Sequence, residues 1–190
     1  MRMKRAYKRP SGPAIVMYCL ITVCALCAAV CFYCYYVRHV SSEWVLWVGI
    51  TAFMIVYHLW LRLIFGNITK LFHIHYGQWW FRERKFEKKL YAFMNVRHWK
   101  KDSLTYDPEA FSLKERTLEQ IANAMAKSET DHWINEGISL FAMLFALIWG
   151  KFWIFALTSA AAMIFDGRFI VIQRYNRPRV LRVMQKEKQR

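Results

Sequence analysis

The feature that most constrains this chain is residues 13–37, a run of 25 residues without a charged side chain. A helix needs about 20 apolar residues to cross the hydrocarbon core of a bilayer. The apolar part of a cleavable signal peptide has only about 7–15 residues. We therefore expect a retained transmembrane helix here, although the leader that precedes it is basic, as a signal peptide would be.

Three later apolar runs predict further membrane helices. Residues 44–65 are apolar except for His58 and Arg62, and two more runs, 134–149 and 152–172, are separated by Gly150 and Lys151. This separation predicts a tight helical hairpin. The run 134–149 is short for a full span, so a tilted helix and a re-entrant hairpin are alternatives for it. We predict an all-α polytopic membrane protein with four transmembrane helices.

The apolar runs divide the chain into four parts. We predict a basic leader with two transmembrane helices in 1–65, a cytoplasmic or interfacial segment in 66–131, a transmembrane hairpin in 132–172 and a basic cytoplasmic tail in 173–190. In the segment 66–131, Lys and Arg alternate with aromatic residues, which is typical of helices that lie in the headgroup layer. Ser112 and Glu115 have the spacing of a capping box, so we expect a helix to begin there.

The distribution of charge predicts the orientation. The chain contains 28 Lys and Arg but only 13 Asp and Glu, which gives a net charge of +15. Of the 28 cations, 24 lie in the leader, the segment 66–131 and the tail. By the positive-inside rule, both termini and the middle segment face the cytoplasm of a cell membrane. Because the cations flank apolar runs, we expect no nucleic-acid partner.

The polar residues at the start of the third apolar run are the first candidates for chemistry. Glu129, His132 and Glu136 are spaced by three and four residues, which places them on one face of a helix. We expect Glu129 to orient the ring of His132, so that His132 acts as a general base toward a hydroxyl group. The alternative is that these residues only solvate the helix end, with Trp133 as an interfacial anchor.

The Glu-x-x-His spacing also occurs in metal sites bridged by carboxylates. Such a site would use Glu129, His132 and Glu136 with His73 and His75, and would make the protein a metal-dependent membrane oxidoreductase. We expect no bound metal, because the chain has no second Glu-x-x-His copy. A non-catalytic scaffold or lipid-binding protein is the other alternative.

The segment after the last apolar run contains Arg174, Arg177 and Arg179. Arginine binds phosphate groups through two parallel hydrogen bonds, so this segment predicts contacts with lipid headgroups or with a nucleotide-bearing donor such as acyl-coenzyme A. A basic stop signal is the alternative. It does not explain Tyr175 and Asn176 between the arginines.

Three clusters together resemble the glycosyl-4,4'-diaponeurosporenoate acyltransferase family, small bacterial membrane proteins of the staphyloxanthin carotenoid pathway. The clusters are residues 96–100, with the sequence Val-Arg-His-Trp-Lys, residues 129–133, with Glu-x-x-His-Trp, and residues 171–179, which directly follow the last apolar run. The resemblance implies transfer of a fatty acyl group from acyl-coenzyme A to a hydroxyl of a membrane glycolipid or related lipid, with no bound cofactor. No Ser or Cys stands out as a nucleophile, so we expect direct transfer between the two substrates.

The resemblance also implies roles for individual residues. His132 would deprotonate the acceptor hydroxyl, and Glu129 would orient His132. Lys100 and the three arginines of the tail would hold donor phosphates or the acceptor headgroup. The expected substrate contacts are Arg97, Trp99, Lys100, Trp133, Glu136, Arg174, Tyr175, Asn176, Arg177 and Arg179.

Overall fold

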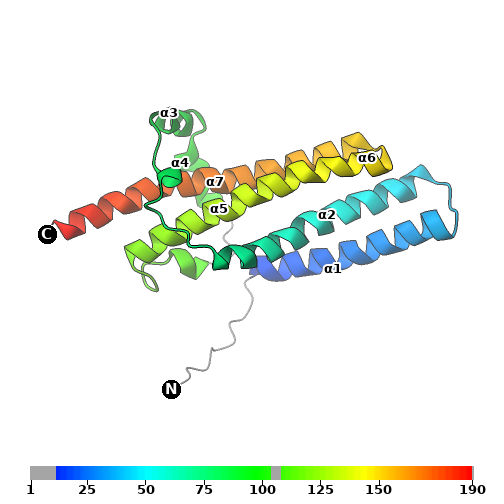
Figure 1. Cartoon of the computed structure of the whole chain (residues 1–190), viewed down its shortest axis with the longest axis horizontal. Helices are drawn as coiled ribbons and strands as arrows, with labels where there is room; N and C mark the ends of the chain where they lie inside the picture. Colours follow the sequence, from blue (N-terminus) through cyan, green and yellow to red (C-terminus); the bar gives the residue numbers. More distant parts are fainter. Residues whose placement is uncertain (1–11, 104–107, 190) are drawn as a thin grey trace, which may run out of the picture.

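The computed structural model describes residues 12–103 and 108–189. Within these residues all regular elements are helical, and four helical stretches are long and apolar enough to cross a membrane. They run side by side along the long axis of the molecule (Figure 1). The predicted all-α polytopic fold is therefore confirmed for this part of the chain. The basic leader lies outside the described residues.

The first two membrane helices form an antiparallel pair. α1 is Gly12–Phe32 and continues into a π-helical turn, Tyr33–Val37; after a short loop, α2 is Glu43–Ile68. Gly49 allows the two helices to approach closely, because a Cβ atom at this position would lie 2.9 Å from the Cβ of Cys31. Small residues at such contacts are typical of helix pairs in membranes.

The second pair is longer and forms the predicted hairpin. α5 is Leu118–Ala142, followed by the 3-10 turn Met143–Phe145 and α6, Ala146–Trp149; α7 is Phe152–Lys188. Gly150 makes the turn with φ +65°, a conformation that glycine adopts without strain. The 37 residues of α7 span about 55 Å, whereas the hydrocarbon core is about 30 Å thick. α7 thus continues through the predicted tail and projects beyond the bilayer.

The start of α5 differs from the sequence prediction. Thr117 caps this helix, since its Oγ1 accepts the N–H of Gln120 at 3.2 Å and its own N–H donates to Oε1 of Gln120 at 3.1 Å. The capping box predicted at Ser112 and Glu115 is therefore wrong. These residues lie in a turn before the helix, and Ser112 Oγ accepts only the N–H of Lys114.

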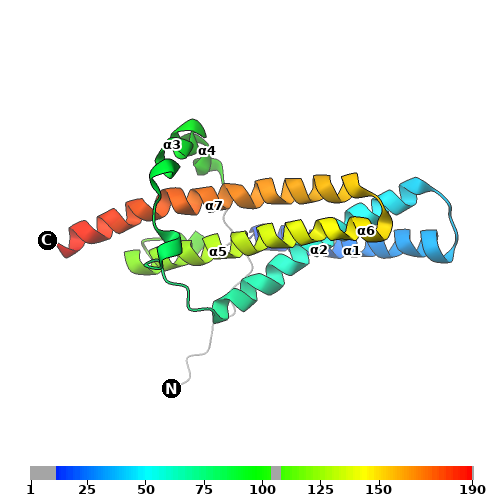
Figure 2. The same cartoon turned by 45° about the horizontal axis from the view of Figure 1, so that its top comes forward.

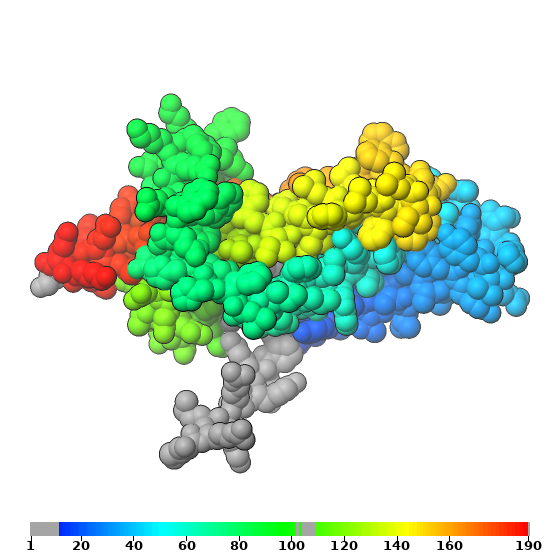
Figure 3. Space-filling model, in the orientation of Figure 1, coloured from blue at the N-terminus to red at the C-terminus, as the bar shows by residue number. Residues whose placement is uncertain are grey.

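Short helices between the two pairs gather at one end of the bundle (Figures 2 and 3). Before the undescribed residues 104–107 they are Thr69–Leu71, Trp79–Phe81, α3 (Lys85–Phe93), α4 (Val96–Trp99) and Lys100–Asp102; Pro108–Phe111 follows. We call residues 79–103 the α3–α4 segment. Its buried Tyr91 and Val96 pack with Tyr175 of α7. The predicted amphipathic segment therefore packs on the projecting part of α7.

The apolar core lies toward the opposite end of the bundle, where α2, α5 and α7 meet. Its buried members are Leu46, Ile50, Met54, Ala142 and Phe155, surrounded by aromatic side chains. The buried charged and amide side chains are instead concentrated toward the end that carries the α3–α4 segment.

Candidate active site

The interior of the α5–α7 pair carries a line of buried polar side chains. On α7, Asp166, Gln173 and Arg177 are spaced by seven and four residues, which brings them to one face of the helix. Glu129 and Asn135 of α5 are buried against this face. Because buried polar groups need hydrogen-bond partners, their pairing defines two clusters.

The first, the His132 cluster, consists of Arg62, His132, Asn135 and Asp166. Nδ1 of His132 lies 2.7 Å from Oδ1 of Asp166, and Nδ2 of Asn135 donates to the same oxygen at 3.1 Å. Arg62 of α2 donates to Oδ2 of Asp166. Asp166 of α7 is fully buried, and side chains from two other helices, α2 and α5, hold both of its carboxylate oxygens.

The ring of His132 is held in one orientation with one nitrogen open. It stacks on Phe169 with the ring centroids 4.8 Å apart and the planes at 8°. Because a carboxylate only accepts hydrogen bonds, the neutral ring carries its proton on Nδ1, which leaves a lone pair on Nε2. Nε2 makes no hydrogen bond to another described residue, and 19% of the side chain is exposed. It is therefore free to accept a proton.

The His132 cluster lies in the second half of the membrane-spanning length of α7. Asp166 lies about 21 Å along α7 from Phe152, within a hydrocarbon core of about 30 Å. Ionisable side chains at this depth cost free energy and most often mark functional sites.

The second, the Glu129 cluster, consists of Glu87, Glu129, Arg174 and Arg177. Oε1 of Glu129 accepts Nη1 of Arg174 at 2.6 Å, and Oε2 accepts Nη1 of Arg177 at 2.7 Å. The predicted contact of Glu129 with His132 is therefore wrong, and Asp166 takes that place. Two guanidinium groups are stronger partners for a buried carboxylate than a neutral imidazole.

Glu87 of α3 completes this cluster. Its Oε1 accepts Nε and Nη2 of Arg174 at 3.0 and 2.5 Å, and its Oε2 accepts the hydroxyl of Tyr91 at 2.9 Å. Burial, together with Glu87, raises the pKa of Tyr91 well above its usual value. Nη2 of Arg177 donates to the carbonyl of Phe81 at 2.9 Å. The cluster thus fastens the α3–α4 segment to α5 and α7.

The three arginines predicted to bind phosphate have different surroundings. The side chains of Arg174 and Arg177 are 12% and 1% exposed, and Glu87 and Glu129 occupy their guanidinium groups. This occupation argues against the predicted phosphate contact for both. Arg179 instead has no carboxylate partner among the described residues and lies over the ring of Tyr175.

Other predicted substrate residues gather around Tyr175. Lys100 donates to Oδ1 of Asn176 at 2.7 Å and lies over the Tyr175 ring, 4.7 Å from its centroid. Trp99 donates its indole N–H to a backbone carbonyl at 2.9 Å, and Arg97 is exposed on α4. The structure therefore brings residues of two of the sequence clusters, 96–100 and 171–179, together.

Two further predicted residues, Trp133 and Glu136, flank the His132 cluster. Trp133 is partly exposed, with its ring edge-on to that of Trp80. Glu136 reaches toward α7, where a Cβ atom on Gly167 would lie 3.6 Å from its Oε1.

Comparison with known proteins identifies the family. The model of the glycosyl-4,4'-diaponeurosporenoate acyltransferase family matches residues 77–186, more than half of the chain. The chain belongs to this family. No curated protein and no solved structure matches it.

The match to this acyltransferase family covers most of both polar clusters. It contains His132, Asp166 and all members of the Glu129 cluster, together with the α3–α4 segment from residue 79 onward. Arg62 lies outside the matched range, on α2. The carboxylate that orients His132 is thus held in part by a helix that precedes the matched region.

The ligand set of the metal-dependent alternative is not assembled. Across residues 12–103 and 108–189, no three His, Cys, Asp or Glu side chains gather as they would around a metal ion. Glu129 faces two arginines, and Nδ1 of His75 accepts the N–H of Gly77 at 3.1 Å.

Four residues of the two clusters were not predicted: Arg62, Glu87, Asn135 and Asp166. Arg62 and Asp166 are charges within apolar runs, and such charges in a membrane need a partner of opposite sign. The sequence therefore indicates that each needs a partner, but not which residue supplies it. Glu87 is one of many charges in a mixed segment, and nothing in the sequence distinguishes it.

Proposed function

We propose that this protein transfers a fatty acyl group from acyl-coenzyme A to a hydroxyl of a membrane glycolipid or related lipid. The observation that carries the proposal is the His132 cluster: a buried carboxylate holds the ring of His132, and the second ring nitrogen is open. Membership of an acyltransferase family supports the same class of reaction.

The chemical step follows from these groups. Nε2 of His132 takes the proton of the acceptor hydroxyl as its oxygen attacks the thioester carbonyl carbon. The new C–O bond forms, the C–S bond breaks, and the proton passes from His132 to the departing thiolate. Asp166 keeps the proton of the neutral ring on Nδ1 and stabilises the imidazolium that forms in between.

The substrates reach the site from two sides. The acceptor is a membrane lipid, so its hydroxyl approaches from the headgroup layer while its chains stay among the apolar outer faces of the helices. The donor is water-soluble at its nucleotide end, which places it on the side of the α3–α4 segment. Under the positive-inside rule this side, with both termini, is cytoplasmic. The protein needs no bound cofactor.

The direct test is acyl transfer by the full chain in lipid nanodiscs. We expect the wild type to acylate a lipid hydroxyl when it receives isotopically labelled acyl-coenzyme A and a bacterial glycolipid extract, with the product identified by mass spectrometry. His132→Ala should lower the rate roughly 10²- to 10⁴-fold, the contribution of a general base.

His39→Gly is the matched control. His39 lies in the loop between α1 and α2 and has φ +54°, which glycine tolerates, so this variant should transfer at the wild-type rate. A folded His132→Ala variant with full activity would contradict the assignment of the base. A wild type that transfers no acyl group would favour the scaffold alternative, and stoichiometric iron, zinc or manganese in the purified protein would favour the oxidoreductase.

A further inference from the structure

A basic groove lies on the face of α7 that points away from Asp166. One cavity of about 410 Å³ lies between α3, α4 and α7, and Lys88, Arg97, Arg179 and Arg182 contribute to its lining. A second hollow, of about 490 Å³, shares Arg179 and Arg182 and adds Lys186. We call these five cations and the two adjoining cavities the basic groove.

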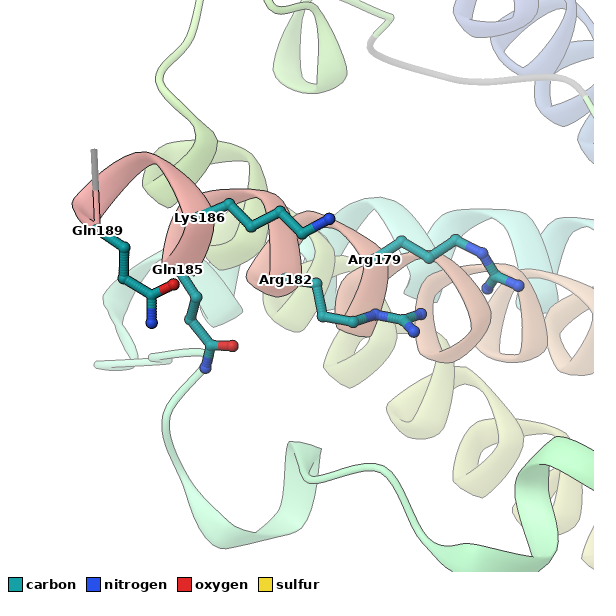
Figure 4. Close-up of a pocket in the computed structure, with 5 residues that line it drawn as sticks. All are labelled: Arg179, Arg182, Gln185, Lys186 and Gln189. Atoms are coloured by element: carbon teal, nitrogen blue, oxygen red, sulfur yellow. The ribbon is translucent and has the colours of Figure 1, made fainter.

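The cations of α7 form one row along this groove. Figure 4 shows Arg179, Arg182 and Lys186 on successive turns, with their charged ends directed back along α7 toward its N-terminal end. Arg97 of α4 and Lys88 of α3 approach the same row from the other side of the first cavity. A stop signal for membrane insertion needs only charges on one side of the bilayer, not cations from three helices around one cavity.

The groove has little compensating negative charge. Glu83 is the acidic residue in its lining, and it lies 4.0 Å from Lys88. In the described part of the chain, Arg97, Arg179, Arg182 and Lys186 form no ion pair with a carboxylate. Arg179 and Arg182 donate hydrogen bonds only to backbone carbonyls of their own helix.

The environment of neighbouring Lys100 reflects the high density of cations at the groove. Burial, and then the charges of Arg179, Arg97 and Lys101, lower the pKa of its ammonium group. Holding like charges together without a counter-ion costs free energy, and a bound polyanion would remove this cost. Arginine is the side chain that matches a phosphate group through two parallel hydrogen bonds.

We propose that the basic groove binds negatively charged organic phosphate groups. Arg179 lies about 40 Å along α7 from Phe152, beyond the hydrocarbon core of about 30 Å, where phosphate groups are found. Two sources share this chemistry: the nucleotide end of the acyl donor and the headgroup of an anionic lipid. The nucleotide source rests on the proposed acyl transfer, whereas the phosphate site itself does not.

Binding is measured without turnover, so that the result is separate from the test of acyl transfer. The full chain is placed in nanodiscs of phosphatidylcholine and titrated with adenosine 3',5'-bisphosphate by isothermal calorimetry. In a second arm, the protein is held in detergent, and its binding to vesicles with and without phosphatidylglycerol is compared. The variants are Arg97→Gln and Arg182→Gln, and the control is Arg116→Gln, an exposed arginine before α5.

If the groove binds the nucleotide, adenosine 3',5'-bisphosphate binds in neutral nanodiscs. Arg97→Gln and Arg182→Gln then each weaken it roughly 10- to 100-fold, as expected for the loss of a charge-assisted contact. If the groove binds lipid, only the vesicle arm responds, and the same two variants reduce the preference for phosphatidylglycerol. Equal behaviour of wild type, variants and Arg116→Gln in both arms would overturn the proposal, even if acyl transfer is intact.

Discussion

The Glu129 cluster and the His132 cluster both lie between α5 and α7, but they differ in which of their polar atoms have a hydrogen-bond partner. In the Glu129 cluster all four carboxylate oxygens accept hydrogen bonds from within the protein. In the His132 cluster the carboxylate is also fully bonded, but Nε2 of His132 is left open. Carboxylates whose oxygens are all paired stabilise the fold, whereas an oriented and unpaired base is available for chemistry.

The largest expected effect concerns the group that orients the base. Asp166→Asn removes the anion that holds the proton on Nδ1 of His132, because the amide can donate to this nitrogen instead. We expect acyl transfer to fall by roughly 10²- to 10⁴-fold, mainly in kcat, when turnover and thermal unfolding are measured on the same preparation.

Asp131→Asn is the control for this substitution. Asp131 is also a paired carboxylate, bound to Lys127 at 2.7 Å, but it lies outside the His132 cluster. It should leave kcat unchanged. If Asp166→Asn turned over at the wild-type rate, the contrast between a reactive and a structural cluster would be wrong, since both clusters would then be structural.

A smaller effect, on stability rather than on turnover, is expected in the Glu129 cluster. Glu129→Gln leaves two buried guanidinium groups without their shared carboxylate, and breaking a buried pair in this way costs about 3–5 kcal/mol. Unfolding of the purified protein in detergent measures this loss. Glu119→Gln, at an exposed position in the first turn of α5, should have almost no effect.

The same variant can contradict the division into two roles. If Glu129→Gln unfolds like the wild type but loses acyl transfer, Glu129 supports catalysis, as the sequence alone predicts. The Glu129 cluster would then belong to the reactive site.

The smallest effect is expected at the edge of the Glu129 cluster. Tyr91→Phe removes one hydrogen bond to Glu87 and should cost about 1–2 kcal/mol of stability without changing kcat. The pKa of Tyr91 is raised in the folded state, so the wild-type contribution is complete below about pH 10, the usual tyrosine value, and is lost as pH rises through the folded value.

The pH dependence sharpens this prediction. Stability measured against pH should decline above about pH 10 in the wild type, and Tyr91→Phe should remove part of this decline. If the stability of both proteins declined identically at alkaline pH, the hydrogen bond from Tyr91 to Glu87 would not be the cause of the decline.

Much of the fold was predictable from the sequence, but the partners within the site were not. The spacing of Glu129 and His132 indicated two polar residues on one helix face, and both do lie on α5. Spacing on one helix cannot state what the facing helix presents. Here α7 presents two arginines to Glu129 and a carboxylate to His132, and these stronger electrostatic partners replace the local contact.

The three arginines predicted to bind phosphate also have partners that the sequence does not reveal. Arg174 and Arg177 face inward and Arg179 faces outward, although all three look alike in the sequence. Because these arginines are spaced by three and two residues, their side chains point in different directions around α7. The α3–α4 segment therefore buries Arg174 and Arg177 and leaves Arg179 in the basic groove.

The sequence by itself determined the membrane helices, the hairpin at Gly150 and the family, because apolar length, turn chemistry and local motifs are properties of neighbouring residues. Only the tertiary structure decided which polar groups meet. Asp166 lies 34 residues from His132 and 104 from Arg62 along the chain, and their contacts exist because three helices pack side by side. In that interior each buried charge must find a counter-charge, and the packing selects which one is within reach.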